Sequence, residues 1–254
     1  MHTYRYGSSA GQEGDLYLPS TPRPSVVALL HGGFWRMPYG RDEMAPAAND
    51  PVGQGYAVWN IEYRRCGAPG GGWPGTLQDV AAAMDHLAVL AAGTAELDLD
   101  HLIVAGHSAG GQLALWVAGR VRSDASLFPP AQVQIRAAAG LAPLPDLQAA
   151  YTLGSGRSAV AEFVGGSPDQ FPERYRASSP MEMLPLNVPQ VILHGVEDEE
   201  VPVAFSRSYV RTARAVGDAV EFFEPAGISH MDVIDPHSAA YAAFRQWMNG
   251  ICAG

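Results

Sequence analysis

The pentapeptide G-H-S-A-G at residues 106–110 matches the pattern G-x-S-x-G, with Ser108 at its centre. An apolar run typical of a strand precedes it, and an Ala- and Leu-rich stretch typical of a helix follows it and ends at Gly119. A strand-to-helix turn of this kind strains the central residue and exposes its hydroxyl at the carboxyl edge of a sheet. The pattern therefore predicts that Ser108 is a nucleophile. The alternative interpretation is a glycine-rich turn that holds an incidental serine.

A second glycine-rich segment, H-G-G-F-W at residues 31–35, also follows an apolar run. Acyl transfer places negative charge on an oxygen, and preorganised backbone N–H groups stabilise that charge. Glycines allow the main chain to approach such an oxygen closely. We expect the donors to be the N–H groups of Gly33 and of Ala109, the residue after the nucleophile, with Gly32 as a further candidate. We expect His31 to shape this loop through hydrogen bonds.

A nucleophilic serine needs a histidine base, and that base needs a carboxylate that fixes its tautomer. In a strand–turn–helix arrangement of this kind the chain order is serine, acid, histidine. His230 fits this order because it lies in a loop shortly after the last apolar run, at residues 220–223. His237 follows Pro236 at the start of the terminal helix and is expected to point away.

The acid is expected in the loop H-G-V-E-D-E-E-V-P at residues 194–202. This loop offers four carboxylates. They belong to Glu197, Asp198, Glu199 and Glu200. The position of the loop does not by itself choose among them.

Apolar runs alternate with longer amphipathic stretches, which predicts a mainly parallel, doubly wound α/β sheet covered by helices on both faces. The expected strands lie at residues 26–30, 57–61, 101–105, 135–141, 188–193 and 220–223. Further helices are expected at residues 76–90, 203–216 and 238–251.

Two regions depart from this alternation. The segments around Tyr4 and at residues 15–18 are too close together for a helical crossover, so we expect an antiparallel hairpin at one edge of the sheet. Residues 143–185 are rich in Gly, Pro and Ser and contain no clear strand. We expect a single domain over residues 1–254, in which this segment is an insertion with short helices that caps the active site.

The composition limits the partners. The formal net charge is −10 and no basic run is present, which argues against nucleic acid or an anionic membrane as a partner. The first residues lack the apolar core of a secretory signal, and no stretch approaches the roughly 20 apolar residues of a membrane span. The sequence therefore favours a cytoplasmic location. Cys66 and Cys252 are expected to be separate thiols, and neither has the spacing of a metal ligand.

Together these motifs resemble those of α/β-hydrolase esterases related to hormone-sensitive lipase and, more closely, of serine-type kynurenine formamidases. The similarity runs from His31 to about Pro236, and the H-G-G-x-W segment is its most formamidase-like feature. The pattern H-G-x-x-D-x-x-V-P resembles the same loop in such hydrolases, including serine peptidases of the prolyl oligopeptidase group. It favours Asp198 as the acid, with Glu197 as the main alternative. The resemblance implies an α/β-hydrolase fold and acyl transfer to water through an acyl-enzyme, without a metal or an organic cofactor.

The resemblance also concerns residues around these motifs. Tyr63, Arg64 and Asp79 are similar to the Y-R…P…D segment of the wider esterase group and are expected to tie a strand to the next helix. Four side chains are candidates for the substrate pocket. They are Phe34, Trp35, His107 and Met231.

The expected function is hydrolysis of a small-molecule substrate, a carboxylic ester or an aryl formamide similar to N-formylkynurenine, by Ser108. A second hypothesis is a short-peptide hydrolase, because the S-S-P segment at residues 178–180 and the H-G-x-x-D loop resemble the oligopeptidase catalytic domain. A third is a non-catalytic ligand-binding module on the same fold. Such modules usually lack the nucleophile or the base, whereas this sequence keeps both.

Overall fold

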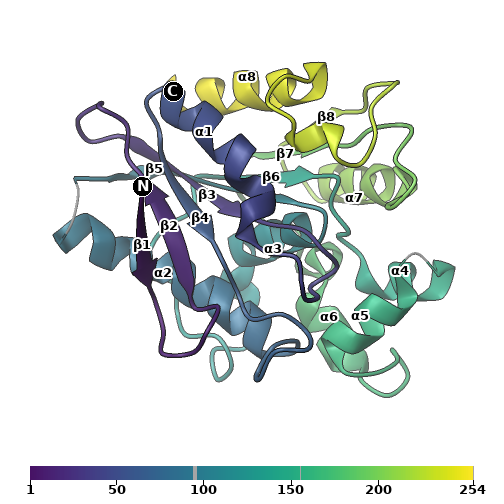
Figure 1. The fold of residues 1–254 in the computed structure, drawn as a ribbon. Helices are drawn as coiled ribbons and strands as arrows, with labels where there is room; N and C mark the ends of the chain where they lie inside the picture. Colours follow the sequence, from purple (N-terminus) through teal and green to yellow (C-terminus); the bar gives the residue numbers. More distant parts are fainter. Residues whose placement is uncertain (94–95, 155, 254) are drawn as a thin grey trace.

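The computed structural model describes residues 1–93, 96–154 and 156–253, and its centre is an eight-stranded sheet (Figure 1). The strands are β1 (His2–Arg5), β2 (Glu13–Tyr17), β3 (Ser25–Leu30), β4 (Ala57–Ile61), β5 (Asp98–His107), β6 (Ala137–Leu141), β7 (Gln190–Leu193) and β8 (Val220–Phe223). Their order across the sheet is β1-β2-β4-β3-β5-β6-β7-β8. The pairs β1–β2 and β2–β4 are antiparallel and all other neighbours are parallel.

The register of the parallel strands aligns their carboxyl ends. Leu30 of β3 pairs with Gly106 of β5, and Leu141 of β6 pairs with both His107 and Leu193. The loops that follow these strands therefore meet at one edge of the sheet, which is where open α/β sheets bind ligands.

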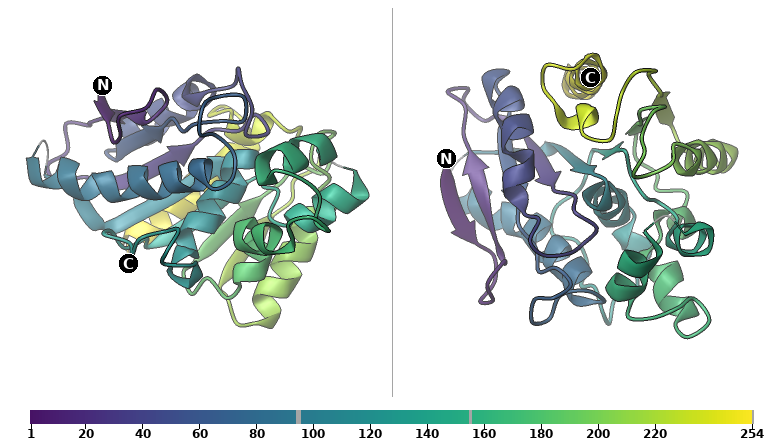
Figure 2. Two further views of the ribbon diagram at one scale, coloured as in Figure 1. Left: turned by 90° about the horizontal axis from the view of Figure 1, so that it is seen from below. Right: turned by 45° about the vertical axis from the view of Figure 1, so that its right-hand side comes forward.

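Helices cover both faces of the sheet (Figures 1 and 2). One layer contains α1 (Ala45–Gly53) and α8 (Ala239–Ala253). The other contains α2 (Gly75–Gly93), α3 (Ala109–Ala118) and α7 (Ala204–Ala215). Between β6 and β7 the chain forms α4 (Leu147–Leu153), α5 (Arg157–Val164), α6 (Pro172–Ser178) and the 3₁₀ turn η3 (Pro180–Met183), which pack against the second layer. The remaining 3₁₀ turns are η1 (Arg41–Met44), η2 (Arg120–Arg122) and η4 (Asp232–Ile234).

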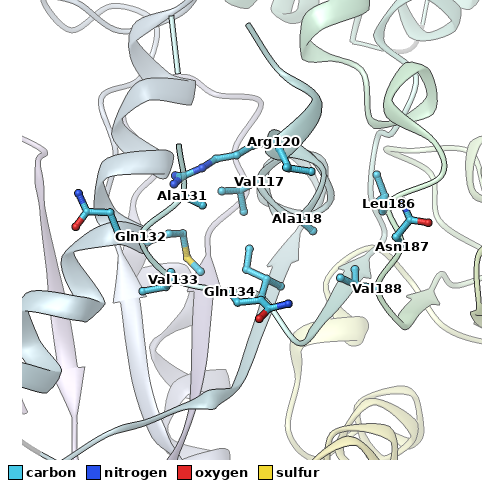
Figure 3. Close-up of a pocket in the computed structure, with 13 residues that line it drawn as sticks. Val117, Ala118, Arg120, Ala131, Gln132, Val133, Gln134, Leu186, Asn187 and Val188 are labelled. Atoms are coloured by element: carbon cyan, nitrogen blue, oxygen red, sulfur yellow. The ribbon is translucent and has the colours of Figure 1, made fainter. Parts of the chain in front are cut away.

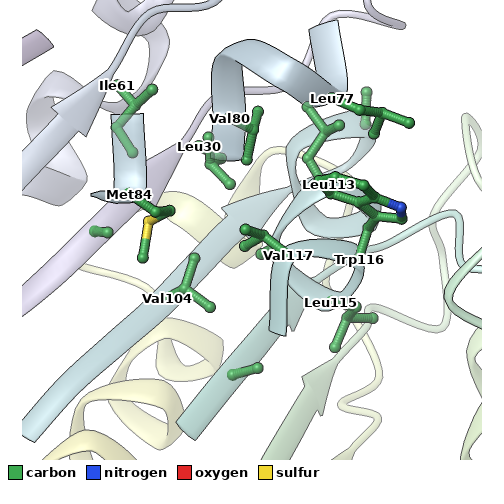
Figure 4. Close-up of a cluster of buried hydrophobic side chains, with 14 of the residues drawn as sticks. Leu30, Ile61, Leu77, Val80, Met84, Val104, Leu113, Leu115, Trp116 and Val117 are labelled. Carbon is green, nitrogen blue, oxygen red and sulfur yellow. The ribbon is translucent and has the colours of Figure 1, made fainter. Parts of the chain in front are cut away.

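Strand β3 shows why the sheet is buried on both sides. Val26, Ala28 and Leu30 belong to the apolar cluster under α2 and α3, and Figure 4 shows Leu30 within it. Val27 and Leu29 belong to the cluster under α1 and α8. Because successive side chains of a strand point to opposite faces, a continuous apolar run fits a sheet that has a helix layer on each side.

The predicted fold class is confirmed, and so is the amino-terminal hairpin, in which His2 pairs with Leu16. Strands β4 and β8 have the predicted bounds, whereas β6 and β7 each begin two residues later than expected. Helix α1 and the turn η1 were missed, because prolines near the start of α1 and at Pro51 hide its helical pattern. None of the described helices is long and apolar enough to cross a membrane.

Candidate active site

Ser108 lies in a tight turn between β5 and α3, with φ 54° and ψ −118°. Its backbone N–H donates to Leu141 O at 2.8 Å, which ties the turn to β6. The flanking glycines are required by contact: a Cβ on Gly106 would lie 2.1 Å from Gly110 O, and one on Gly110 would lie 2.2 Å from Leu30 O. The strained turn therefore needs glycine two residues before and two residues after the serine, which is the G-x-S-x-G pattern.

His230 and Asp198 meet through a short hydrogen bond, in which His230 Nδ1 donates to Asp198 Oδ2 at 2.6 Å. Both side chains are almost completely buried. Glu197, the alternative acid, instead accepts a hydrogen bond from the N–H of Gly227 on the exposed side of the loop. The structure therefore brings Asp198, and not Glu197, to His230.

The carboxylate of Asp198 is held on both oxygens. Oδ1 accepts from the N–H groups of Glu200 and Val201, at 2.9 and 2.8 Å. His194 Nε2 lies 3.2 Å from Oδ2. Burial by itself would raise the pKa of Asp198, but the contacts with His194 and His230 and the Val201 N–H hold it well below its usual range. The carboxylate is therefore ionised over the whole range in which histidine titrates.

The tautomer of His230 follows from these contacts. Because an ionised carboxylate only accepts, Nδ1 carries a proton, and a neutral ring then has its lone pair on Nε2. Within the described ranges, nothing forms a hydrogen bond with His230 Nε2 or with Ser108 Oγ. Both residues line the same cavity, so the basic nitrogen and the hydroxyl share one space.

The loop after β3 has an unusual backbone, because Gly33, Phe34 and Trp35 all have positive φ angles (90°, 53° and 56°). The N–H of Gly32 donates to Glu43 Oε1 at 3.2 Å and is therefore already paired. The N–H groups of Gly33 and Ala109 have no partner among the described residues. This corrects the expectation for Gly32 and leaves two candidate donors, of which Ala109 is the first residue of α3.

Trp35 does not line the cavity, which corrects the prediction made for it. Its side chain is fully buried and stacks on Phe163 of α5, with the ring centroids 4.6 Å apart. Its Nε1 donates to Gln112 Oε1 at 2.9 Å, and Gln112 Nε2 donates to the carbonyl of Ser178. Trp35 therefore anchors the glycine loop to α3 and to the segment between β6 and β7.

The cavity beside Ser108 has a volume of about 600 Å³. Phe34, His107 and Met231 line it, and none of the described residues of the segment 143–185 does. Glu200, one of the four candidate acids, also lines it. Most of its other walls come from positions that were not expected there from the sequence. They are Pro38, Tyr39, Gly40, Asp42, Glu43, Glu62 and Arg65. Pro38 and Gly40, which come shortly after the H-G-G motif, were the sequence feature that could have indicated that the chain turns there and forms a wall of the cavity.

The Tyr–Arg–Asp segment has the structural role that was predicted. Arg64 donates through Nε and Nη2 to both oxygens of Asp79, at 2.8 and 2.6 Å, and so ties the end of β4 to α2. Tyr63 stacks on His31 and donates to its carbonyl oxygen at 2.8 Å. The contacts of Tyr63 with His31 therefore support the start of the loop that contains Gly33.

A second cavity, of about 450 Å³, lies between the carboxyl end of α3 and the segments that lead into β6 and β7 (Figure 3). It is on the opposite edge of the sheet from Ser108, and Val117, Val133 and Leu186 are among its lining residues. None of the described residues that line it is a Ser, His or Cys. Among the described residues, no group of His, Cys, Asp and Glu side chains is arranged to hold a metal ion.

The strand order, the strained serine turn and the paired His–Asp after β7 and β8 define a protein of the α/β-hydrolase fold. Within that class the chain belongs to the BD-FAE family, whose sequence model matches residues 15–212. This confirms the resemblance to α/β-hydrolase esterases.

The chain is similar to Esterase LipC of Mycobacterium tuberculosis, with 29% identity over 248 residues that cover 91% of this chain and 59% of that protein. It is 32% identical to the Kynurenine formamidase of Danio rerio over 114 residues, which cover 44% of this chain and 36% of that one. The chain thus spans less than two thirds of the length of these relatives.

Two solved structures share the fold. Esterase B from Lactobacillus rhamnosis aligns with a TM-score of 0.82 at 22% identity, covering 99% of this chain and 85% of that one. The carboxylesterase Cest-2923 from Lactobacillus plantarum aligns with a TM-score of 0.75 at 20% identity, covering 98% and 95%.

Proposed function

We propose that the chain is a serine hydrolase that cleaves a small carboxylic ester or an aryl formamide through an acyl-enzyme on Ser108. The observation that carries this proposal is the hydrogen bond between His230 Nδ1 and the ionised Asp198, beside the cavity that Ser108 also lines. It leaves the basic Nε2 of His230 available in the same space as the serine hydroxyl.

In this mechanism Ser108 Oγ forms a bond to the carbonyl carbon of the substrate while His230 Nε2 takes the hydroxyl proton. The carbonyl π electrons move to the oxygen, and the N–H groups of Gly33 and Ala109 stabilise the resulting negative charge. As the tetrahedral intermediate collapses, the bond to the leaving group breaks and His230 returns the proton to the departing alcohol or amine. Water then attacks the acyl-enzyme by the same steps and releases the acid.

The relatives support both substrate classes. Esterase LipC and Esterase LipQ are named as esterases, and the latter is 28% identical over 85% of this chain. The Danio rerio relative is named as a formamidase. Esters and aryl formamides both have a carbonyl carbon and a good leaving group, so one Ser–His–Asp set serves either. We therefore place a small-molecule ester first and an aryl formamide second.

The test measures kcat/KM of the wild type and of Ser108→Ala on p-nitrophenyl butyrate and on N-formyl-L-kynurenine. We expect roughly 10⁴ M⁻¹s⁻¹ or more on the preferred substrate, a value typical of enzymes acting on suitable substrates. Ser108→Ala should lower kcat on the order of 10⁶-fold, as the loss of a nucleophilic serine does elsewhere. Equal turnover by the alanine variant and the wild type would overturn the proposal. The ratio of the two wild-type values decides between an esterase and a formamidase.

A further inference from the structure

His107, the residue before the serine, is bonded at both ring nitrogens although the mechanism above does not use it. Its Nδ1 lies 2.6 Å from Glu43 Oε1, and its Nε2 lies 3.0 Å from the backbone carbonyl oxygen of His230. The imidazole is only 2% exposed. A buried histidine with two short contacts of this kind has a fixed ring orientation.

The contacts also determine where protons lie. A backbone carbonyl only accepts, so His107 Nε2 carries a proton and donates it to His230 O. Burial by itself would raise the pKa of Glu43, but its contacts with His107 and with the Gly32 N–H lower it. One proton therefore lies between His107 Nδ1 and Glu43 Oε1, and it joins the two side chains into a hydrogen-bonded pair.

Glu43 extends the pair to the loop that carries Gly33. The same Oε1 that meets His107 accepts the N–H of Gly32 at 3.2 Å. A Cβ on Gly32 would lie 2.9 Å from Glu43 Oε1 and 3.0 Å from His107 Nδ1, so the loop packs directly on the pair. On the other side, the rings of His107 and His230 have their centroids 4.5 Å apart.

We propose that Glu43 and His107 are positioning residues that hold the His230 loop and the Gly32–Gly33 loop in place on either side of Ser108. The pair links these two loops by hydrogen bonds, from His107 to the carbonyl of His230 and from Glu43 to the N–H of Gly32. His107 is the last residue of β5 and directly precedes the nucleophile. This inference rests on the proposed function, because it assigns a role to residues around the same serine. It assigns a role to His107, the first variable residue of the G-x-S-x-G motif.

The position of the base and of the oxyanion donors matters more in the transition state than in the bound substrate. Loss of the pair should therefore lower kcat while KM changes little. His107→Asn keeps an amide near the position of Nδ1, where it can bond to Glu43, but it loses the donor to His230 O. His107→Gln places an amide donor near the position of Nε2 and so restores that bond.

We would measure kcat, KM and melting temperature for both variants with p-nitrophenyl butyrate, beside Ser108→Ala. His107→Asn should lower kcat about tenfold or more, since it leaves a buried carbonyl without its donor. His107→Gln should recover most of that loss. The matched control is His101→Asn, the same substitution at another β5 histidine whose Nδ1 meets a carboxylate (Asp98, 2.7 Å), and it should leave kcat and KM unchanged.

Glu43→Ala allows a second test of the pair, by a double-mutant cycle that compares the losses of kcat. Because His107→Asn can keep the bond to Glu43, the cycle uses His107→Ala, which removes it; if the two residues act as one unit, the double variant loses no more kcat than the worse of the two single variants. Independent, additive losses would contradict the pair.

The outcomes separate the two proposals. If Ser108→Ala is inactive but His107→Asn and Glu43→Ala keep the wild-type kcat, the positioning role is wrong and the proposed function stands. If Ser108→Ala is as active as the wild type, the proposed function fails. Equal losses in His107→Asn and His107→Gln, together with a lower melting temperature in both, would assign His107 a purely structural role and overturn the inference.

Discussion

Asp198 and Glu197 are adjacent carboxylates with different environments. Asp198 is buried and its oxygens face two backbone N–H groups and two imidazoles, whereas Glu197 bonds to the main chain at the surface. The sequence offered several acids in this loop, and the fold of the loop around His194 and His230 makes them different. A position in the chain cannot carry that information, because His230 comes from a different segment and the fold decides which carboxylate meets it.

Replacing Asp198 by Asn should remove the charge that holds the His230 tautomer while keeping the shape of the side chain. We expect kcat to fall on the order of 10⁴-fold, since an amide at this place favours the wrong tautomer. Steady-state kinetics on p-nitrophenyl butyrate measures the effect. Glu197→Gln is the matched control and should keep the wild-type kcat; a large loss there would reassign the acid.

Asp198 also predicts how stability depends on pH. Its folded pKa lies below the unfolded value of about 3.9, so it stabilises the fold fully above that value. The contribution is lost progressively as the pH falls from about 4 toward the folded pKa. Urea unfolding at pH 7, 5, 4 and 3 should show a smaller loss of stability below pH 4 for Asp198→Asn than for the wild type. Parallel pH profiles for the two proteins would be incompatible with the lowered pKa.

Among the elements, the β5–α3 turn depends on contacts that only glycine allows. A Cβ at Gly110 would collide with the carbonyl oxygens of Leu30 and His31, and backbone atoms of a central strand cannot move aside. Gly250 in α8 is the opposite case, because nothing lies within 4 Å of the Cβ it lacks.

The same substitution should therefore have opposite effects at these two positions. Gly110→Ala should lower the free energy of unfolding by about 3 kcal/mol or more through overpacking. Gly250→Ala should raise it by about 0.5–1 kcal/mol, because alanine has the higher helix propensity. Urea denaturation of both variants measures the difference, and stabilisation by Gly110→Ala would show that the turn is looser than described.

Elements with a strong pattern could be predicted from the sequence. The strands, the hairpin and the serine turn follow from apolar runs and glycine spacing, and those signals are local. The wall formed by Pro38, Tyr39 and Glu43 was missed, because the chain there has no periodic pattern. Trp35 was placed in the pocket wrongly, because three successive positive φ angles turn its side chain into the core.

For the molecule as a whole, the sheet determines which loops, and so which side chains of the site, lie close together. The loops after β3, β5, β7 and β8 contribute Gly33, Ser108, Asp198 and His230, and the aligned carboxyl ends of these strands bring them to one edge. Two buried apolar clusters enclose the sheet, one on each face. In the segment between β6 and β7, Phe163 packs behind Trp35 and so supports the glycine loop, and none of the segment's described residues lines the cavity. We therefore propose that this segment supports the site from behind rather than covering it, within a single domain.

We propose that His230 activates Ser108 as a nucleophile in the intact protein. The most direct measurement is the intact mass after reaction with a fluorophosphonate, followed by mapping of the modified peptide, for the wild type, Ser108→Ala and His230→Ala. We expect one adduct per wild-type chain, located on Ser108, none on Ser108→Ala and a much slower reaction of His230→Ala. An adduct on another residue, or labelling of His230→Ala at the wild-type rate, would contradict it.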